Sequence, residues 1–324
     1  MGMSDTLDKH IHYLTHLNRD RKNGGAPHKP ILLLAVINLI EKSEINTYRI
    51  VISPELVLEF KDIWSRLVET QHNVNFALPF FHMRSEPFWK LVAKPGFEIP
   101  VTSSKSIKSF RALKESLAYA EISQELFLLL NDEVCREIVR RELHEAYFPN
   151  SYQNHNMVGY GYRSELIRQL FNENKAKYKS RIEELRQLLS ADNFEEEAFV
   201  RSAVFKREIP RLYNYQCAVS GLRIESTINA QMVDACHIEP FSVNGDDTVR
   251  NGICLTPTIH RAFDRGLLTI DSDYCVCISR AIVESDSPFS LLQFDRKPIL
   301  LPESPTYYPS LDNLSYHQKE IFVS

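Results

Sequence analysis

The stretch DACHIEPFSVNGDDTVRNGICLTPTIHRAFDRGLL, residues 234–268, sets two histidines and one asparagine among turn-forming residues and short apolar runs. His237 ends a short segment in which apolar and polar residues alternate, as they do in a strand. Asn251 follows after a polar loop that contains Asn-Gly-Asp-Asp, and His260 lies nine residues further on. Pro257 is typical of the first turn of a helix. The pattern therefore predicts a strand, a loop, a second strand and a helix.

This arrangement resembles the HNH, or ββα-metal, endonucleases, whose three characteristic residues fall here on His237, Asn251 and His260. The resemblance covers about residues 205–275, with CAVSGL on its upstream side and NGICLTPTIHRAFDRGLL on its downstream side. It implies a DNA endonuclease that hydrolyses phosphodiester bonds with one divalent ion, Mg²⁺ or Mn²⁺, in each active site.

We assign His237 as the general base, because a neutral imidazole with an unperturbed pKa of about 6.5 is suited to take a proton from water. Asn251 has two alternative roles. It either completes the metal shell or holds the loop that aims His237.

For the metal ligands we choose His260 and Asp234, with Asp264 as a third and second-ranked carboxylate. His260 and Asp264 are four residues apart, so both side chains share one face of the predicted helix. Carboxylate and imidazole suit a divalent ion that polarises a phosphate. Many members of the fold place a ligand immediately before the base, and this chain has Cys236 there.

The alternative is that these histidines are structural. A single histidine beside an apolar strand is more often a hydrogen-bonded core residue than a catalyst. The two histidines together with the asparagine, the carboxylates and the surrounding sequence favour the nuclease, and an inactivated HNH fold that only binds DNA is the competing interpretation.

The six cysteines predict neither disulfides nor a structural zinc. Some members of the fold hold zinc with two CxxC pairs, and the equivalent positions here read Cys217-Ala-Val-Ser220 and Cys254-Leu-Thr-Pro257. Two thiolates leave a tetrahedral zinc site incomplete. We therefore expect Cys217, Cys254, Cys275 and Cys277 to be small buried apolar residues.

Composition limits the function classes. The 324 residues suggest two domains, and 44% hydrophobic with 25% charged residues is usual for a globular protein. A net charge of -4 means that any contact with nucleic acid must use local basic patches. The N-terminal residues lack a signal-peptide pattern, and no apolar run approaches the roughly 20 residues of a membrane span, so we expect a cytoplasmic protein.

Helical periodicity dominates the N-terminal half, with helices expected at about 5–17, 31–42, 54–69, 106–119 and 123–147 and from 163 to 189. The aromatic stretch 73–92 suggests irregular or short-strand structure. The predicted fold class is α+β: a mostly helical N-terminal DNA-binding domain over 1–172, a helical linker over 173–200 and a ββα-metal HNH nuclease domain over 201–324.

Two N-terminal motifs, RKNGGAPHKPILLLA at 21–35 and LPFFHMRSEPFW at 78–89, resemble the sulfur-binding domain of modification-dependent HNH restriction enzymes. That resemblance covers about residues 5–170 and implies recognition of DNA in which sulfur replaces one non-bridging phosphate oxygen. Predicted contacts to the phosphorothioate and backbone are, as cations and donors, Arg21, His28 and Lys29, and, as the apolar wall, Leu78, Pro79, Phe80 and Phe81, with His82 beside the pocket.

The overall hypothesis is a type IV restriction endonuclease acting on double-stranded phosphorothioated DNA. One HNH site cuts one strand at a time, so we expect a homodimer on DNA. Two alternatives stay open: the nuclease is triggered by a methylated base or by plain sequence, or the protein is a non-catalytic DNA-binding module.

Overall fold

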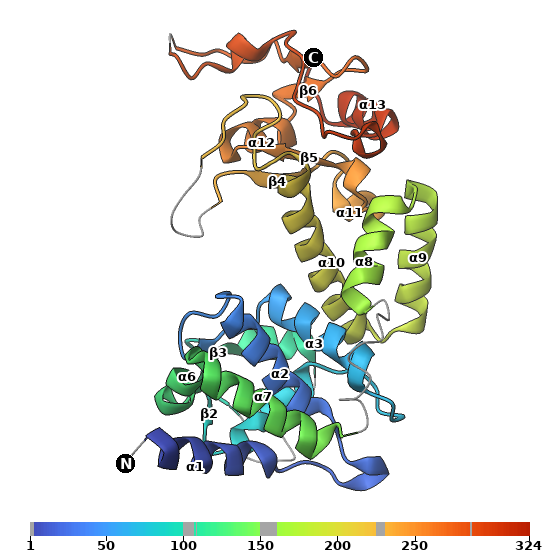
Figure 1. Ribbon diagram of the computed structural model, residues 1–324. Helices are drawn as coiled ribbons and strands as arrows, with labels where there is room; N and C mark the ends of the chain where they lie inside the picture. The colour runs from blue at the N-terminus through green and yellow to red at the C-terminus, as the bar shows by residue number, and fades with distance from the viewer. Residues whose placement is uncertain (1–2, 100–106, 108, 150–160, 225–230, 286) are drawn as a thin grey trace. The chain divides into compact units, whose positions relative to one another are not determined.

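The computed structural model describes residues 3–99, 107, 109–149, 161–224, 231–285 and 287–324 (Figure 1). The chain divides into two compact units. Unit 1 comprises Met1–Glu165 and Leu189–Val200, and unit 2 comprises Leu166–Leu188 and Arg201–Ser324. Helices and small antiparallel sheets occur in both units, so the fold class is α+β, as predicted.

Unit 1 is built around the apolar helix α2, His28–Glu41, which packs against α3, α4, α6 and α7. Residues 29–37 of α2 are all buried, because a helix that is apolar on every side must be covered on every side. The Ser53 side chain caps the start of α3 by accepting a hydrogen bond from the Leu56 amide at 3.2 Å. The helices of this unit are α1 Met3–Thr15, α2 His28–Glu41, α3 Pro54–Leu67, α4 Ala77–His82, α5 Phe110–Ser116, α6 Gln124–Asn131 and α7 Glu133–Tyr147.

A three-stranded antiparallel sheet completes unit 1, in the order β1 Arg49–Ile50, β3 Leu117–Ile122 and β2 Trp89–Ala93. The helix predicted over 106–119 is therefore wrong at its end, where pairing with two neighbouring strands overrides the local helical pattern. Residues 106 and 108 of that prediction lie outside the described residues. The aromatic stretch 73–92 differs as well, since it contains the helix α4.

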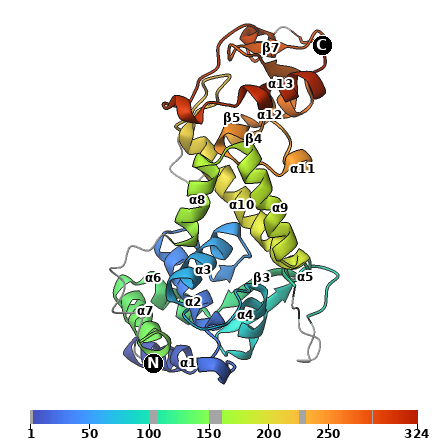
Figure 2. The same ribbon diagram turned by 90° about the vertical axis from the view of Figure 1, so that its right-hand side faces the viewer.

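Unit 2 contains the predicted strand, loop, strand and helix (Figure 2). Strand β4, Asp234–His237, pairs antiparallel with β5, Gly252–Leu255, and His237 lies opposite Gly252. The connection between the two strands includes the short helix α11, Phe241–Asn244, and β5 leads into helix α12, Pro257–Asp264. A second hairpin, β6 Leu268–Ile270 and β7 Val276–Ile278, and helix α13, Leu311–Glu320, pack next to these elements.

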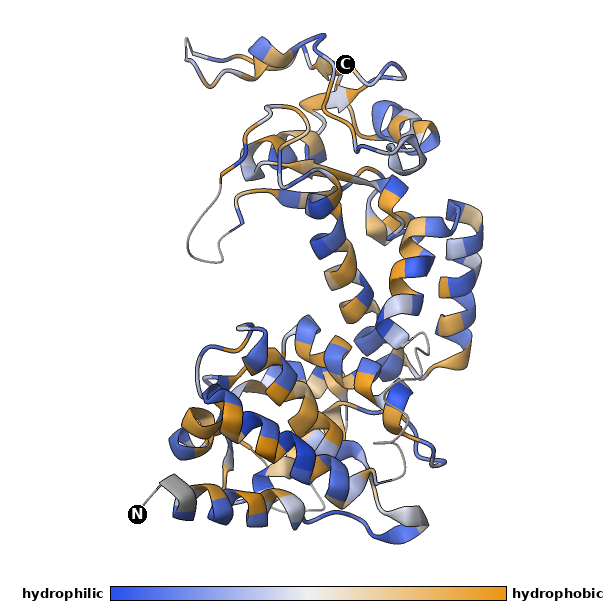
Figure 3. Ribbon diagram, in the orientation of Figure 1, coloured by the Kyte–Doolittle hydropathy of each residue, from blue (hydrophilic) through white to orange (hydrophobic). Residues whose placement is uncertain are grey.

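Three further helices are α8 Tyr162–Asn172, α9 Lys175–Leu188 and α10 Ala191–Leu212, of which α8 and α10 include residues of both units and α9 lies in unit 2. Polar and apolar segments alternate along them, as in amphipathic helices (Figure 3). The predicted linker, 173–200, is divided between the units. Residues 173–188 belong to unit 2, in which Tyr178 and Ile182 of α9 are buried, and residues 189–200 belong to unit 1. Among the described residues, none of the helices combines the length and the apolar character that crossing a bilayer requires.

Candidate active site and recognition pocket

His237, the predicted general base, is held by a buried carboxylate. Its Nε2 donates to Oδ1 of Asp247 at 2.8 Å, and the Asp247 side chain is fully buried. A carboxylate only accepts, so Nε2 carries a proton, and in the neutral ring the lone pair is then on Nδ1, as a general base requires. Asp247 was not among the predicted site residues, although it is one of two adjacent acids in the polar loop.

A ring stack fixes the plane of the His237 imidazole. Phe205 of α10 lies parallel to it, with the ring centroids 3.9 Å apart and an interplanar angle of 5°. Gly252, opposite His237, permits this arrangement, because a Cβ there would lie 2.3 Å from Ile209 Cδ1 and 3.0 Å from the Phe205 ring. The glycine that follows Asn251 therefore lets α10 approach the hairpin closely.

Asn251 is fully buried and bonds only to backbone among its described contacts. Its Oδ1 accepts from the Glu239 amide, and its Nδ2 donates to the carbonyls of Glu239 and Asp246, each at 2.9 Å. These contacts favour the second of the two roles considered from the sequence. Asn251 holds the loop that carries Asp247, and so acts on His237 through that loop.

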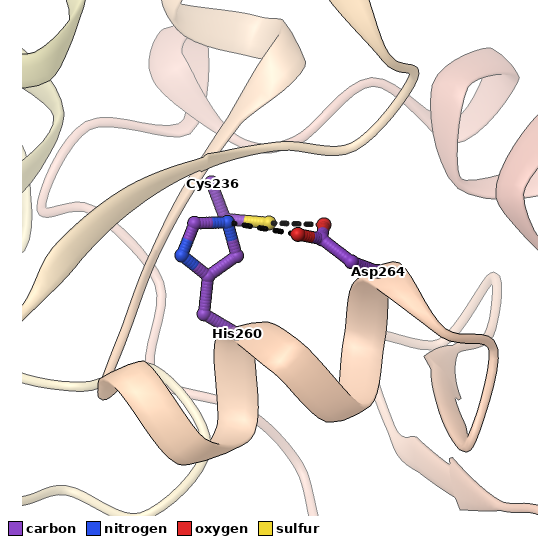
Figure 4. Close-up of side chains that lie close together, drawn as sticks. All are labelled: Cys236, His260 and Asp264. Atoms are coloured by element: carbon purple, nitrogen blue, oxygen red, sulfur yellow. Dashed lines mark hydrogen bonds and ion pairs between the residues drawn. The ribbon is translucent and has the colours of Figure 1, made fainter.

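The predicted metal ligands Asp234 and Asp264 both contact the His260 imidazole, and Figure 4 shows His260 with Asp264 and Cys236. His260 on α12 has Asp264 Oδ2 at 3.4 Å from Nε2 and Asp234 Oδ2 at 3.3 Å from Nδ1. Cys236 joins His260 and Asp264 in a group whose donor atoms all lie within 4.8 Å of one another. The sequence prediction placed Asp234 ahead of Asp264 as a metal ligand. In the structure Asp264 belongs to the donor cluster with His260, whereas Asp234 contacts the other ring nitrogen of His260.

This donor set fits a divalent ion. An imidazole and a carboxylate are ligands for Mg²⁺, Mn²⁺ and Zn²⁺, and a histidine ligand normally donates its second N–H to a carboxylate. Asp234 stands in that second position. Burial raises the pKa of the Cys236 thiol, and the nearby Asp264 carboxylate raises it further.

Cys217 and Cys254, the two cysteines at degenerate zinc positions, are buried in unit 2. Cys217 Sγ accepts from the backbone amides of Ser220 and Thr256, each at 3.4 Å. Burial raises the pKa of Cys254 to about 12. Cys277 is also buried and Cys275 is partly exposed.

In unit 1 the two N-terminal motifs meet at one cavity of about 670 Å³. Its described lining residues include His28 and Lys29 from the first motif and Leu78, Pro79 and His82 from the second. Residues not predicted from the sequence also line it, namely Asn18, Arg19, Asp20, Ala26, His72 and Ser85.

Lys29 forms a buried ion pair in this cavity. Its ammonium donates to Glu86 Oε1, to Ser85 Oγ at 2.8 Å and to the Asn18 carbonyl at 2.6 Å. Burial lowers the pKa of Lys29, and the bond to Glu86 opposes that shift. The positive charge predicted for DNA contact at Lys29 is therefore largely neutralised by Glu86.

Phe80 and Phe81, predicted as part of the apolar wall, do not line the cavity. Both are fully buried, and Phe80 packs edge to face against Trp89. Helical spacing in α4 explains the correction, since Leu78 and His82 are four residues apart on one face, whereas the two phenylalanines face the core.

Arg21, a predicted cation, is exposed and lies outside the cavity lining, whereas Arg19 lies in it. The Arg19 guanidinium stacks on Tyr147 with 4.5 Å to the ring centroid. Gly25, at φ +86°, leaves room for it, because a Cβ there would lie 2.9 Å from Arg19 Nη1. The sequence NRDRK, residues 18–22, does not show whether Arg19 or Arg21 lines the cavity. The turn at Gly24 and Gly25 leaves space for the Arg19 side chain.

His28 lies at the cavity with its ring 4.6 Å from that of Trp64, and its Nε2 donates to the Asn73 carbonyl at 2.9 Å. Burial lowers the pKa of His28. The imidazole is therefore neutral near pH 7 and presents a polar but uncharged surface to the cavity.

An imidazole held by a buried carboxylate, together with donors for one divalent ion on strand β4 and helix α12, is what a metal-assisted phosphodiester hydrolase requires. These features define the ββα-metal nuclease class. Residues 217–271 match the family model of the HNH endonucleases. The chain therefore carries an HNH endonuclease domain, which confirms the prediction for this region.

Other comparisons are weaker. No curated protein matches the chain. A solved structure described as a modification-dependent TagI restriction endonuclease is similar with 27% sequence identity and a TM-score of 0.30. The match covers 38% of this chain and 39% of that protein, so this chain spans about two fifths of its length.

Proposed function

We propose that this protein is a restriction endonuclease that recognises phosphorothioated DNA with unit 1 and hydrolyses nearby phosphodiester bonds with unit 2. The observation that carries the proposal is the pairing of an HNH site in one unit with a cavity in the other that gathers residues from both N-terminal motifs.

In the hydrolysis, His237 Nδ1 takes a proton from the attacking water, and Asp247 stabilises the imidazolium that forms. His260 and Asp264 would hold one divalent ion, and Asp234 would orient the His260 ring. When bound, that ion polarises the phosphate and stabilises the leaving oxygen. Successive side chains of a strand point to opposite faces, so His237 and Cys236 flank the end of β4. The scissile phosphate is therefore expected at the end of this strand, between the base and the metal donors.

For recognition, Leu78 and Pro79 provide an apolar surface for sulfur, which is larger and more weakly hydrated than oxygen. Arg19 and His82 provide hydrogen-bond donors to the phosphate that carries it, whereas the one N–H of neutral His28 is already used by the Asn73 carbonyl. Apolar discrimination of one small group contributes about 1–3 kcal/mol, so the cavity favours sulfur over oxygen by tens-fold to a few hundred-fold.

A methylated-base reader is the less favoured alternative. Such a reader flips its target into a pocket and stacks it between aromatic or apolar side chains. The described lining of the cavity contains no Phe, Tyr or Trp, and Phe80 and Phe81 are buried in the core.

The test incubates the protein with plasmid that carries or lacks phosphorothioate, each with and without divalent metal. We expect cleavage only when both the modification and the metal are present. Because each site cuts one strand, we also expect a homodimer on DNA and a nicked intermediate before the linear product.

Binding to matched duplexes with one or no phosphorothioate separates the alternatives. Equal affinity for the two duplexes rejects sulfur recognition and favours the base or sequence reader. Tight binding to modified DNA without any cleavage, under every metal tested, favours the non-catalytic module.

A further inference from the structure

Cys236 occupies the position next to the base, and its side chain faces the other two donors of the cluster (Figure 4). Its Sγ lies 3.7 Å from Asp264 Oδ1, and the second oxygen of Asp264 lies 3.4 Å from His260 Nε2. The carboxylate is therefore placed between a sulfur and a nitrogen donor. The thiol itself is completely buried.

These separations can be compared with those around a bound ion. Donors about 2.1 Å from a tetrahedral ion, with sulfur at about 2.3 Å, are about 3.4 Å apart for a nitrogen–oxygen pair and about 3.6 Å apart for a sulfur–oxygen pair. Adjacent donors around an octahedral Mg²⁺ at about 2.1 Å are only about 3.0 Å apart. The observed 3.4 Å and 3.7 Å involve the two different oxygens of Asp264, and both exceed the octahedral spacing.

The exposure of the cluster is also uneven. The Cys236 side is closed, whereas the Asp264 side chain is 57% exposed and that of His260 is 25% exposed. A centre with three protein donors and one open side is typical of catalytic zinc sites, and thiolates select softer ions than oxygen donors do.

We propose that Cys236 is a metal ligand and that it makes this centre selective for a zinc-class ion, Zn²⁺ or Co²⁺, over Mg²⁺. The proposal rests on the proposed nuclease function and replaces the Mg²⁺ or Mn²⁺ expected from the sequence resemblance. Ion binding releases the thiol proton to solvent, so one sulfur–metal bond replaces one sulfur–hydrogen bond.

The test adds Co²⁺ to the full-length protein and records its absorption spectrum, which reports sulfur ligation directly through a thiolate-to-cobalt charge-transfer band in the near ultraviolet. We expect this band in the wild type and its loss in Cys236→Ser. Removing a supporting residue of a metal site typically lowers affinity 10–100-fold, so loss of a direct ligand should lower Zn²⁺ affinity by about 100-fold. Mg²⁺ affinity should change by less than about 3-fold, because a hydroxyl is no worse a ligand for it than a thiol.

The matched control is Cys254→Ser, which alters a buried thiol on the neighbouring strand β5 outside the cluster. It should keep the charge-transfer band, and thermal unfolding should show that both variants are folded. A band that persists in Cys236→Ser, or one lost in Cys254→Ser, overturns the proposal. Cobalt binding without a charge-transfer band also overturns it and leaves the Cys236 thiol as a hydrogen-bond donor to Asp264.

Cleavage by the wild type separates this proposal from the proposed function. If the protein cuts modified DNA with Mg²⁺ and its spectrum shows no sulfur ligation, only the metal assignment fails. If it binds Co²⁺ through Cys236 and never cuts DNA, the metal assignment stands and the nuclease function fails.

Discussion

The HNH site of unit 2 and the cavity of unit 1 are assembled in different ways. In unit 2, the base and the metal donors all lie within residues 234–264, on one hairpin and the helix that follows it. In unit 1, the cavity joins residues 18–29 with residues 72–85, and its lysine is already paired with Glu86. The first site holds charged and reactive groups ready for chemistry, whereas the second offers a mostly neutral surface with few unpaired charges. In the proposed function, catalysis therefore depends on a few fixed atoms, and recognition depends on the shape of the cavity.

The largest effect should come from the base. His237→Ala should reduce cleavage of modified DNA by about 10²–10⁴-fold, because general base catalysis contributes that range. Binding to the modified duplex should be unchanged, since the cavity belongs to unit 1. Single-turnover cleavage and a binding assay on the same duplex measure the two effects. Cleavage within 3-fold of wild type would show that another group takes the proton.

Lys29 tests the opposite expectation, that a residue in the cavity is mainly structural. Lys29→Met should lower the free energy of unfolding by about 3–5 kcal/mol, because it leaves the buried Glu86 carboxylate without its cation. Urea unfolding measures the change. The control is Arg111→Met, which breaks the exposed pair with Glu195 and should cost less than about 1 kcal/mol. A similar small cost for both variants would mean that Lys29 is free to contact DNA.

Acid should weaken unit 2 through His317, whose burial lowers its pKa to about 4. In the fold, His317 Nε2 donates to the Phe263 carbonyl, and Nδ1 faces the Thr269 hydroxyl. Since the unfolded chain takes up this proton near pH 6.5 and the folded chain only near pH 4, the native state loses about 3 kcal/mol as the pH falls across that window. Urea unfolding of wild type and His317→Gln between pH 7 and pH 4 measures this. A pH dependence that is unchanged in the variant would contradict the assignment.

Asp247 should show a smaller catalytic effect than the base that it holds. Asp247→Asn keeps the size of the side chain and removes the charge that stabilises the imidazolium, so kcat should fall by about 10–100-fold, a part of the contribution of the base. KM should stay constant. Asp246→Asn is the matched control, because Asp246 bonds to the Thr248 amide and not to His237. Equal losses in the two variants would indicate a general disturbance of the loop.

The smallest effect concerns the apolar wall of the cavity. Leu78→Ala should lower the preference for phosphorothioated over plain duplex by about 10-fold or less, a part of the 1–3 kcal/mol available from apolar discrimination. Leu128→Ala is the control, since Leu128 is 68% exposed and lies outside the cavity lining. Competition binding with the two duplexes gives the ratio. An unchanged ratio in Leu78→Ala would place the sulfur contact elsewhere.

Much of unit 2 could be predicted from the sequence because its site is local. The periodicity of the segment, the proline before His260 and the spacing of the two histidines indicate β4, β5 and α12 directly. Asp247 and Phe205 could not be assigned in this way. Both acids of the polar loop are buried, and the sequence does not say which of them contacts His237. Phe205 reaches His237 because Gly252 lets α10 approach.

Less of unit 1 could be predicted because its cavity depends on long-range packing. Helical spacing in α4 separates Leu78 from Phe80, but the sequence alone predicts no helix in that aromatic stretch. The pairing of Lys29 with Glu86 joins residues 57 positions apart. The choice of Arg19 over Arg21 depends on a turn whose shape is set by positive φ angles at two glycines.

The single carboxamide of Asn251 ties together the two ends of the segment from Glu239 to Asp246. These hydrogen bonds fix Glu239, two residues beyond His237, and Asp246, the residue before Asp247, relative to each other. The loss of this one side chain should therefore release both ends of the segment at once, and with them the partner of the imidazole.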